Sequence, residues 1–351
     1  GLPFSSKALR ECYAEAAKVF GWEKRPLEPR SMRDAQGRLL GWGMGTAQFP
    51  ATFFAAQARA TLRADGTALV ETSGVDMGQG AWTALAQIAA DGLGLDIEQV
   101  EFRSGSSDLP DAGIAGGSGH TATAGAALHA AGSDALEKLT EMAVNDPASP
   151  LFGAGNAGVV PRNGRLHRAD DDARSESYAE ILARAGQEIV VGEGSSSRAP
   201  SAAEAHAFFS HGAIFAETAV DPDLGQVRVT RMVGAFAAGR IINPKLAKSQ
   251  LEGGMIWGLS FALHEAAVHD PVTGRIANAD LAGYHVPVHA DIPAMQVLTV
   301  HEDDPHVNAL GVKGVGELAI SGAAGAIANA IWHATGKRAR KFPIHLETLI
   351  G

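Results

Sequence analysis

The amino-acid sequence predicts an α+β fold, a mixed α/β architecture made of two similar subdomains. Its 351 residues correspond to about two domains at roughly 150 residues each. Two segments follow the same plan, in which two alternating apolar strands flank a turn containing Asp and Gly, and a Gly-containing loop then leads into an apolar helix. A hairpin and a helix used twice predict two related subdomains, residues 1–200 and 201–351.

The first subdomain is expected to begin with a helix. Its apolar residues recur at helical spacing and include Leu9, Cys12, Tyr13, Ala16 and Phe20. Cys12 is predicted to be a small core residue and not a nucleophile. Because Cys12 is the single cysteine, the sequence excludes an intrachain disulfide and an iron–sulfur cluster held by cysteines of this chain alone.

The two hairpins are marked by their turns, Asp65-Gly66 in the first and Asp223-Leu224-Gly225 in the second. Each hairpin is followed by an apolar helix with a glutamine near its beginning, Gln79 and Gln250. The run GEGSSSRAPSAAEA is expected to be a flexible connector, which places the boundary near residue 200. Three tryptophans on apolar helices are expected to be packing residues: Trp82, Trp257 and Trp332.

Charge and hydropathy exclude two classes of partner. The formal net charge is −10, and Lys and Arg are scattered apart from the short run KRARK, so no basic surface for nucleic acid is expected. No apolar window approaches the roughly 20 residues needed to span a bilayer, so no membrane span is expected. The sequence GLPFSSKALRE at the start shows no targeting signal.

Two Gly-rich loops are candidate binding sites. GVDMGQG at residues 74–80 and GGSGHTATAG at residues 116–125 each precede an Ala-rich helix. A Gly-rich loop at a helix N-terminus offers free backbone N–H groups and a positive dipole end, which suit a phosphate or pyrophosphate. Either loop taken alone is more simply explained as an ordinary turn, but two loops together favour a binding function.

Glu317 is the one carboxylate in the Gly- and Ala-rich stretch GVKGVGELAISGAAGAIANAI. A helix over residues 321–335, closed by Gly336, is expected to follow it. Gly314, Gly316 and Ala319 match the dinucleotide pattern G-x-G-x-x-A, but the chain ends too soon afterwards for a Rossmann unit. The residues alone leave two alternatives of equal weight for Glu317, a charge near a helix N-terminus or a catalytic base with a raised pKa.

A family resemblance favours the catalytic base. The pieces MGQG, GGSGHTATAG, GRIINPKLAKSQLEGGMIWGLSFALHE, DIP and GVKGVGE, in this order, resemble the molybdopterin-binding large subunit of the xanthine dehydrogenase and aldehyde oxidase family. The resemblance extends over essentially the whole chain but covers only the C-terminal half of such a subunit. It is strongest to bacterial aldehyde oxidoreductases, and it implies that both subdomains belong to the molybdenum cofactor-binding domain.

The resemblance assigns a role to individual residues. It implies that Glu317 is the catalytic base, which takes a proton from the oxygen that attacks the substrate. It also implies a cofactor-binding role for ten residues, around the pterin, its dinucleotide and the pyrophosphate: Met77, Gly78, Gln79, Gly80, Gly117, Ser118, Thr121, Thr123, Gln250 and Gly316. No residue of this chain is expected to bind the metal directly. Tyr284 is a further candidate for the wall of the active site.

The same resemblance implies a cofactor and partners. The cofactor is molybdopterin with molybdenum, in its cytosine dinucleotide form, and the reaction oxidises aldehydes to carboxylic acids with water as the oxygen source. The expected partners are a chain supplying the N-terminal half, an Fe-S subunit and an FAD subunit, in the cytoplasm or, after export with a partner, in the periplasm. Two alternatives remain open: hydroxylation of an N-heterocycle, and a non-catalytic subunit that handles the cofactor or assists assembly.

Overall fold

The computed structural model describes residues 1–350, which form two compact units. Unit 1 comprises Gly1–Pro3, Ala51–Ala207 and Asp304–Gly314; unit 2 comprises Phe4–Pro50, Phe208–Asp303 and Val315–Gly351. The sequence analysis assigned residues 4–50 to the first subdomain, whereas the contacts group them with the second. The cause is a long-range strand pairing in unit 2, in which residues 39–50 lie antiparallel to residues 209–220.

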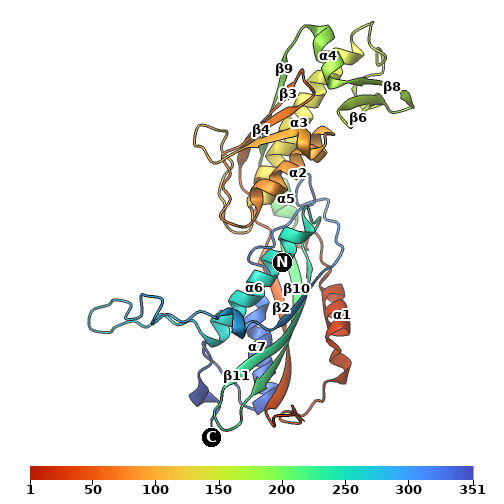
Figure 1. Ribbon diagram of the computed structural model, residues 1–351. Coiled ribbons are helices and arrows are strands. Elements are labelled where there is room, and N and C mark those ends of the chain that lie inside the picture. The colour runs from red at the N-terminus through yellow and green to blue at the C-terminus, as the bar shows by residue number, and fades with distance from the viewer. Residues whose placement is uncertain (351) are drawn as a thin grey trace. The chain divides into compact units, whose positions relative to one another are not determined.

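Unit 2 is a five-stranded sheet covered by helices on both faces (Figure 1). The strand order is β1-β2-β10-β11-β12, with β11 and β12 parallel and the other neighbours antiparallel. One face packs against α6 and α7, the other against α1. The bounds are α1 Leu9–Phe20, β1 Met32–Arg33, β2 Leu39–Pro50, β10 Phe209–Val220, β11 Val227–Ala237, α6 Pro244–Leu263, β12 Ala294–Thr299 and α7 Ile320–Thr335.

Alternation along β10 explains the two-sided packing of this sheet. Ile214 and Ala216 join the core beneath α6 and α7, whereas Ala213 and Phe215 join the core beneath α1. Cys12 lies fully buried in the α1 core, as the sequence predicts. Gly336 ends α7 in the left-handed conformation, which also agrees with the prediction.

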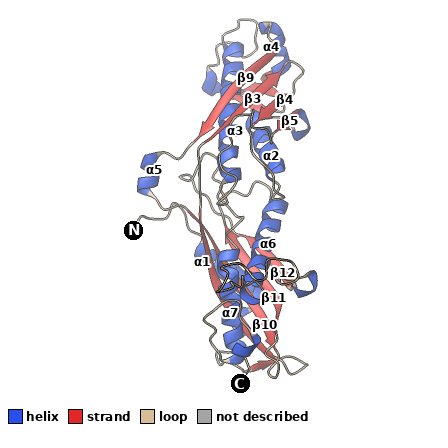
Figure 2. Cartoon of the chain, turned by 90° about the vertical axis from the view of Figure 1, so that its left-hand side faces the viewer, coloured by secondary structure: helices blue, strands red, loops and turns tan. Residues whose placement is uncertain are grey.

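Unit 1 contains a four-stranded sheet in the order β5-β4-β3-β9, with α2 and α3 packed beside each other (Figure 2). A three-stranded antiparallel sheet, β6-β7-β8, and α4 complete it. The bounds are β3 Ala56–Arg63, β4 Ala68–Glu71, α2 Ala81–Leu93, β5 Val100–Arg103, α3 His120–Val144, β6 Val159–Arg162, β7 Arg165–Arg168, β8 Asp171–Ser177, α4 Tyr178–Ala185, β9 Ile189–Ser196 and α5 Pro200–Ala205.

Each unit contains a predicted hairpin followed by its helix. Hairpin β3–β4 precedes α2, and hairpin β10–β11 precedes α6, so the predicted mixed α/β fold is confirmed. The expected connector is different: the residues GEGSS lie in β9, paired with β3 in the sheet of unit 1, and PSAAEA forms the short helix α5. The Ser-rich composition hid a strand because its alternate residues are glycines.

The units share one packing device, a glycine-bearing strand against an Ala-rich helix. In unit 2, Gly45 on β2 faces α7, and a Cβ there would lie 2.8 Å from the backbone N of Ala326. In unit 1, Gly194 on β9 faces α3, and a Cβ there would collide with the backbone of Ala127 and Ala131. Backbone therefore meets backbone in both places, which only glycine permits.

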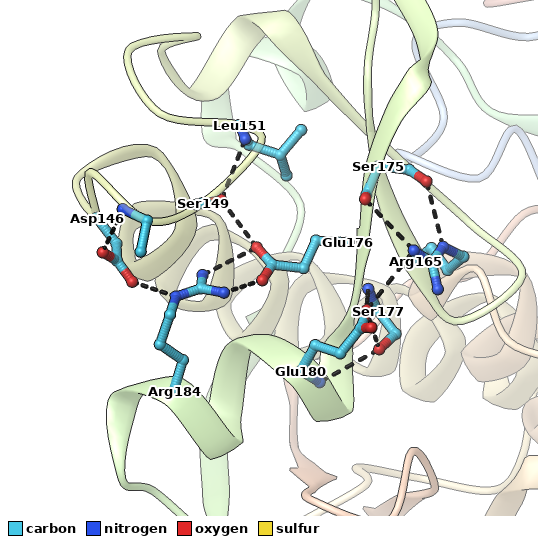
Figure 3. Close-up of polar contacts among 10 residues, drawn as sticks. Asp146, Ser149, Leu151, Arg165, Ser175, Glu176, Ser177, Glu180 and Arg184 are labelled. Carbon is cyan, nitrogen blue, oxygen red and sulfur yellow. Dashed lines mark hydrogen bonds and ion pairs between the residues drawn. The ribbon is translucent and has the colours of Figure 1, made fainter.

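The end of unit 1 that carries α4 is tied together by a polar network (Figure 3). Arg184 on α4 contacts Glu176 on β8 and Asp146 just after α3. Ser149 donates a hydrogen bond of 2.8 Å to the same carboxylate of Glu176, which is buried. The guanidinium and the hydroxyl together satisfy this buried charge, as a buried carboxylate requires.

Candidate functional site

In unit 1 the loop of residues 116–119 is held in a strained, glycine-dependent shape. Gly117 and Ser118 both have positive φ angles, 57° and 56°, and a Cβ at Gly119 would lie 2.9 Å from the carbonyl oxygen of Thr52. A Cβ at Gly314 would collide with the carbonyl oxygen of Ser118. The Ser-containing loop and the beginning of the sequence GVGE are therefore in direct backbone contact, which sequence spacing did not reveal.

The N-terminus of α3 follows this loop, and its N-cap, Gly119, makes no side-chain cap hydrogen bond. An α-helix leaves its first backbone N–H groups without partners inside the helix, and its dipole makes this end positive. The half-buried Thr121 lies in the first turn. This end of α3 has the chemistry of an anion site.

His120, the first residue of α3, is a buried imidazole whose two ring nitrogens have no hydrogen-bond partner among the described residues. Its ring lies against the other Gly-rich loop, because a Cβ at Gly74 would approach Nε2 to 2.7 Å. Burial lowers the pKa of His120, and the charge of Asp76 opposes that shift only in part. The two predicted loops therefore meet at an imidazole that still has hydrogen bonds to make.

The loop of residues 74–80 is already satisfied by its own side chains. The carboxylate of Asp76 accepts hydrogen bonds from the backbone N–H groups of Gly78 at 2.8 Å and Trp82 at 3.2 Å. Burial acts to raise the pKa of Asp76, but these backbone donors outweigh it and hold the pKa below its usual value. A negative charge thus occupies the N-terminus of α2, so an anion fits better at α3 than here.

Two predicted cofactor residues make internal contacts instead of facing an open site. The half-buried amide of Gln79 folds back onto its loop, donating to the carbonyl of Val75 at 3.1 Å and accepting from the N–H of Met77 at 2.6 Å. Thr123 is fully buried, and its hydroxyl accepts a hydrogen bond of 3.1 Å from the N–H of Phe54. Met77 itself is exposed.

A buried ion pair stabilises the segment Asp304–Gly314 of unit 1. Nζ of Lys313 lies 3.1 Å from Oδ2 of Asp304, and both side chains are excluded from solvent. The other carboxylate oxygen of Asp304 accepts a hydrogen bond of 3.0 Å from the N–H of His306. The pair joins the two ends of residues 304–313, immediately before Gly314.

In unit 2, Glu317 lies half-buried in the turn before α7. Ser321 links this turn to the sheet: its hydroxyl donates to the carbonyl of Leu318 at 2.7 Å and accepts from the N–H of Gln48 at 3.1 Å. The N-cap of α7 is Ala319, so Glu317 lies two residues before it, near the positive end of the helix dipole. These two hydrogen bonds of Ser321 are not predicted by the sequence pattern.

Gln250 lies on α6, at the same end of unit 2 as Glu317. The helices α6 and α7 run in the same direction, because a Cβ at Gly254 would meet Ala319 at 2.9 Å and Gly258, one turn later, faces Ala323. Gln250 is one turn before Gly254, so the register places it level with the turn that carries Gly316 and Glu317. The helix register thus places Gln250, Gly316 and Glu317 at a similar level along α6 and α7.

Residues 1–350 contain neither a candidate membrane span nor a candidate metal cluster. No helix in this part of the chain is long and apolar enough to cross a membrane. The same residues contain no group of three or more His, Cys, Asp or Glu side chains placed to hold a metal ion.

Comparison with known proteins identifies relatives of this chain. A family model described as molybdopterin cofactor-binding domain matches residues 15–293. The aldehyde oxidoreductase molybdenum-binding subunit PaoC of Escherichia coli K12 is 37% identical over 99% of this chain and 45% of its own length. The putative xanthine dehydrogenase molybdenum-binding subunit XdhA of the same organism is 30% identical over 97% of this chain and 45% of its own length. The chain thus spans about half the length of these relatives.

Solved structures share the fold. Quinoline 2-oxidoreductase from Pseudomonas putida 86 superposes with a TM-score of 0.84 at 23% identity, covering 98% of this chain and 45% of that chain. A Cu,Mo-CO dehydrogenase superposes with a TM-score of 0.82 at 20% identity, covering 96% of this chain and 44% of that chain. These structures show the fold, and the family model together with PaoC confirms the family resemblance inferred from the sequence motifs.

Proposed function

Because the chain belongs to the family of molybdopterin cofactor-binding domains, we propose that it forms part of the catalytic subunit of a molybdenum hydroxylase, with Glu317 as the general base. When bound, the cofactor supplies the oxygen-transfer centre and accepts the two electrons released by oxidation. The observation that carries the proposal is the placement of Glu317 and Gln250 near the N-terminus of α7, where α7 packs against the middle of α6.

The residues of unit 1 fit the anionic part of such a cofactor. The strained loop at Gly117 and Ser118, the N-terminus of α3 and the unsatisfied nitrogens of His120 are donors for a pyrophosphate. Thr121 lies in the same first turn and adds a hydroxyl. We assign Gln79 to the pterin or its dinucleotide, where its amide replaces the internal contacts with Val75 and Met77. The proposed form of the cofactor is the cytosine dinucleotide.

In this proposal Glu317 is the proton acceptor. Its carboxylate removes the proton from the oxygen that attacks the substrate carbon, and Ser321 holds the turn that aims it. Gly316 keeps bulk away from the carboxylate. In the net reaction an aldehyde and one water give a carboxylic acid, two protons and two electrons.

The substrate class that we propose is an aldehyde. PaoC, which is named as an aldehyde oxidoreductase, is 37% identical to this chain, whereas XdhA is 30% and the nicotine 6-hydroxylase large subunit of Paenarthrobacter nicotinovorans 27% identical. These last two relatives support the second candidate, hydroxylation of an N-heterocycle. Rates with an aromatic aldehyde and with hypoxanthine, measured on one preparation, distinguish the two.

The proposal requires other polypeptides. One supplies the N-terminal half of the molybdenum subunit, and Fe-S and FAD subunits receive the electrons, because Cys12 alone cannot ligate a cluster. The assembled complex is proposed to work in the cytoplasm, or in the periplasm when a partner is exported with this chain bound.

Replacement of Glu317 by Gln tests the proposal. The complex is purified through a tag on this chain, and its molybdenum content, released nucleotide and dye-linked aldehyde oxidation are measured. We expect Glu317→Gln to retain molybdenum and to lose about 10²–10⁴-fold in kcat, the usual contribution of a general base. The matched control is Glu252→Gln on α6, whose carboxylate pairs with Lys248 at the surface. Full activity in Glu317→Gln, with molybdenum bound, would instead favour the non-catalytic alternative.

A further inference from the structure

Helix α6 carries an apolar row that faces solvent in unit 2. Trp257 and Phe261 lie four residues apart, and 54% and 48% of their surfaces are exposed, although the sequence predicts that Trp257 packs inside. The ring of Phe261 contacts that of Phe342 at a centroid distance of 5.1 Å, and Phe342 is exposed as well. The opposite face of α6 is buried against the sheet. The apolar side chains of this row therefore lie outside the hydrophobic core of unit 2.

The chain after α6 forms an arm, residues 265–291, that extends from unit 2 (Figure 1). The arm is ordered by its own hydrogen bonds. Asn278 accepts from the N–H of Val268 at 2.9 Å and donates to the carbonyl of Ala266 at 2.8 Å. Tyr284, the candidate for the active-site wall, donates to the carboxylate of Glu265 at 2.8 Å, so the beginning of the arm is joined to a residue in its second half.

The ordered arm exposes aliphatic side chains. Val272 and Leu281 are each 90% exposed. Four more apolar side chains on the arm are also exposed: Val268, Ile276, Val286 and Val288. A run of six exposed aliphatic residues on one segment is unlike the single exposed apolar residues that are normal on a protein surface. Such a segment gains free energy when another protein covers it.

We propose that the α6 row and the arm together form a docking surface for the polypeptide that supplies the N-terminal half of the molybdenum subunit. This inference rests on the proposed function. The match covers 45% of the length of PaoC and of XdhA, so in these relatives a further stretch of polypeptide of comparable size accompanies the part that matches this chain. Trp and Phe anchors with an aliphatic surround are typical of the centre of a large, permanent interface.

Site-specific photo-crosslinking tests the docking surface. A benzoyl-phenylalanine residue is placed at Val272, Leu281 or Trp257, and at Leu224 as an exposed control in the turn between β10 and β11 of the same unit. The tagged chain is produced in the organism that naturally makes it, the cells are irradiated, and the crosslinked peptides are identified by mass spectrometry. We expect the three surface positions to link, at least about tenfold more than Leu224, to sequence that matches the N-terminal half of the relatives. That sequence counts whether it is a separate chain or continuous with this one.

Three crosslinking results would overturn the proposal. A link from the arm to a second copy of this chain would show a homodimer contact, and a link to an Fe-S or FAD chain would show a different interface. The absence of any link would show that the arm is not covered by another protein. Leu281→Glu and Trp257→Glu provide a second test, since we expect a loss of at least about tenfold in recovered partner with an unchanged melting temperature of the isolated chain. Leu224→Glu is the control and retains the partner.

Molybdenum content separates this inference from the proposed function. Links to the N-terminal half in a preparation without molybdenum support the docking surface and contradict the enzymatic proposal. Molybdenum with no such links supports the enzyme and contradicts the docking surface.

Discussion

Nζ of Lys313 lies 3.1 Å from Oδ2 of Asp304, and neither side chain reaches solvent. Removing one partner of a buried pair leaves an uncompensated charge, which costs about 3–5 kcal/mol. We expect Lys313→Met to lower the free energy of unfolding by up to that amount in urea titrations, because Arg198 still interacts with the charge of Asp304. The double variant Lys313→Met/Asp304→Leu should recover part of the loss, because the carboxylate that lost its lysine is removed. Equal instability of the single and double variants would contradict this account.

Ser321 connects strand β2 with the turn that bears Glu317, so its hydroxyl is expected to affect the position of that carboxylate. Ser321→Ala removes both hydrogen bonds. We expect a stability loss of only about 1 kcal/mol, since the residue is exposed, but a drop of about tenfold in kcat of the assembled enzyme. Ser321→Thr keeps the hydroxyl and should restore the rate. A rate for Ser321→Ala equal to that of the natural protein would show that the turn holds its place without Ser321.

Gly253 and Gly254 are neighbours on α6 with opposite surroundings. A Cβ at Gly253 meets nothing within 4 Å, whereas a Cβ at Gly254 would lie 2.9 Å from that of Ala319. We therefore expect Gly253→Ala to stabilise the isolated chain by about 0.5–1 kcal/mol, as in an exposed helix. Gly254→Ala should destabilise it by about 1–3 kcal/mol, because α7 must move away. Thermal unfolding of the two variants gives the comparison, and the same sign for both would refute it.

His333 is expected to make the stability of unit 2 sensitive to acid. Its Nδ1 accepts a hydrogen bond of 3.0 Å from the N–H of Trp42, and its Nε2 lies 2.9 Å from the carbonyl of Pro26, which is the pattern of a neutral ring. Burial and then the charge of Arg25 lower the pKa of His333, although the contact with Pro26 opposes them.

The sign of this pH effect follows from the lowered pKa. The folded ring binds a proton less readily than the unfolded ring, whose pKa is about 6.5. Stability is therefore complete above about pH 6.5 and falls as the pH drops below it. Urea titrations between pH 5 and 8 measure this loss. The variant His333→Gln should be less stable at pH 8 but flatter in its pH profile, and an unchanged acid slope would assign the effect to another group.

Local sequence patterns predicted α1, both hairpins and α7. The signals for these elements, which are apolar periodicity, turn residues and a glycine at a helix C-terminus, each involve residues that are close together in the sequence. The sequence LLGWGMGTAQFP of β2 was not recognised, since glycine is depleted in strands, and its pairing with β10 joins residues far apart in the chain. Because of that pairing, residues 4–50 belong to unit 2 and not to the subdomain in which the sequence places them. The sheet of β6, β7 and β8 was missed as well, because its strands are short and charged.

Part of the candidate site was also beyond sequence reasoning. Lys313 stands in the same apolar stretch as Glu317 and signals a buried charge, but nothing in the pattern names Asp304 as its partner. Among residues 1–350 the ring nitrogens of His120 have no hydrogen-bond partner, and the ring lies against Gly74 of the other loop, which sequence spacing does not show. Conversely, the composition of GVDMGQG favours a phosphate loop, and only the structure shows that Asp76 already fills the end of α2.

The contact of α7 with the glycines of β2 limits how the protein can vary. Side chains packed between a helix and a sheet set the distance between the two, and a change in their size changes that distance by fractions of an ångström. At Gly45 there is no spacer, so the distance between strand and helix axis is fixed by the peptide groups themselves. A substitution elsewhere on α7 leaves this distance unchanged, so the turn that carries Glu317 keeps its position relative to β2.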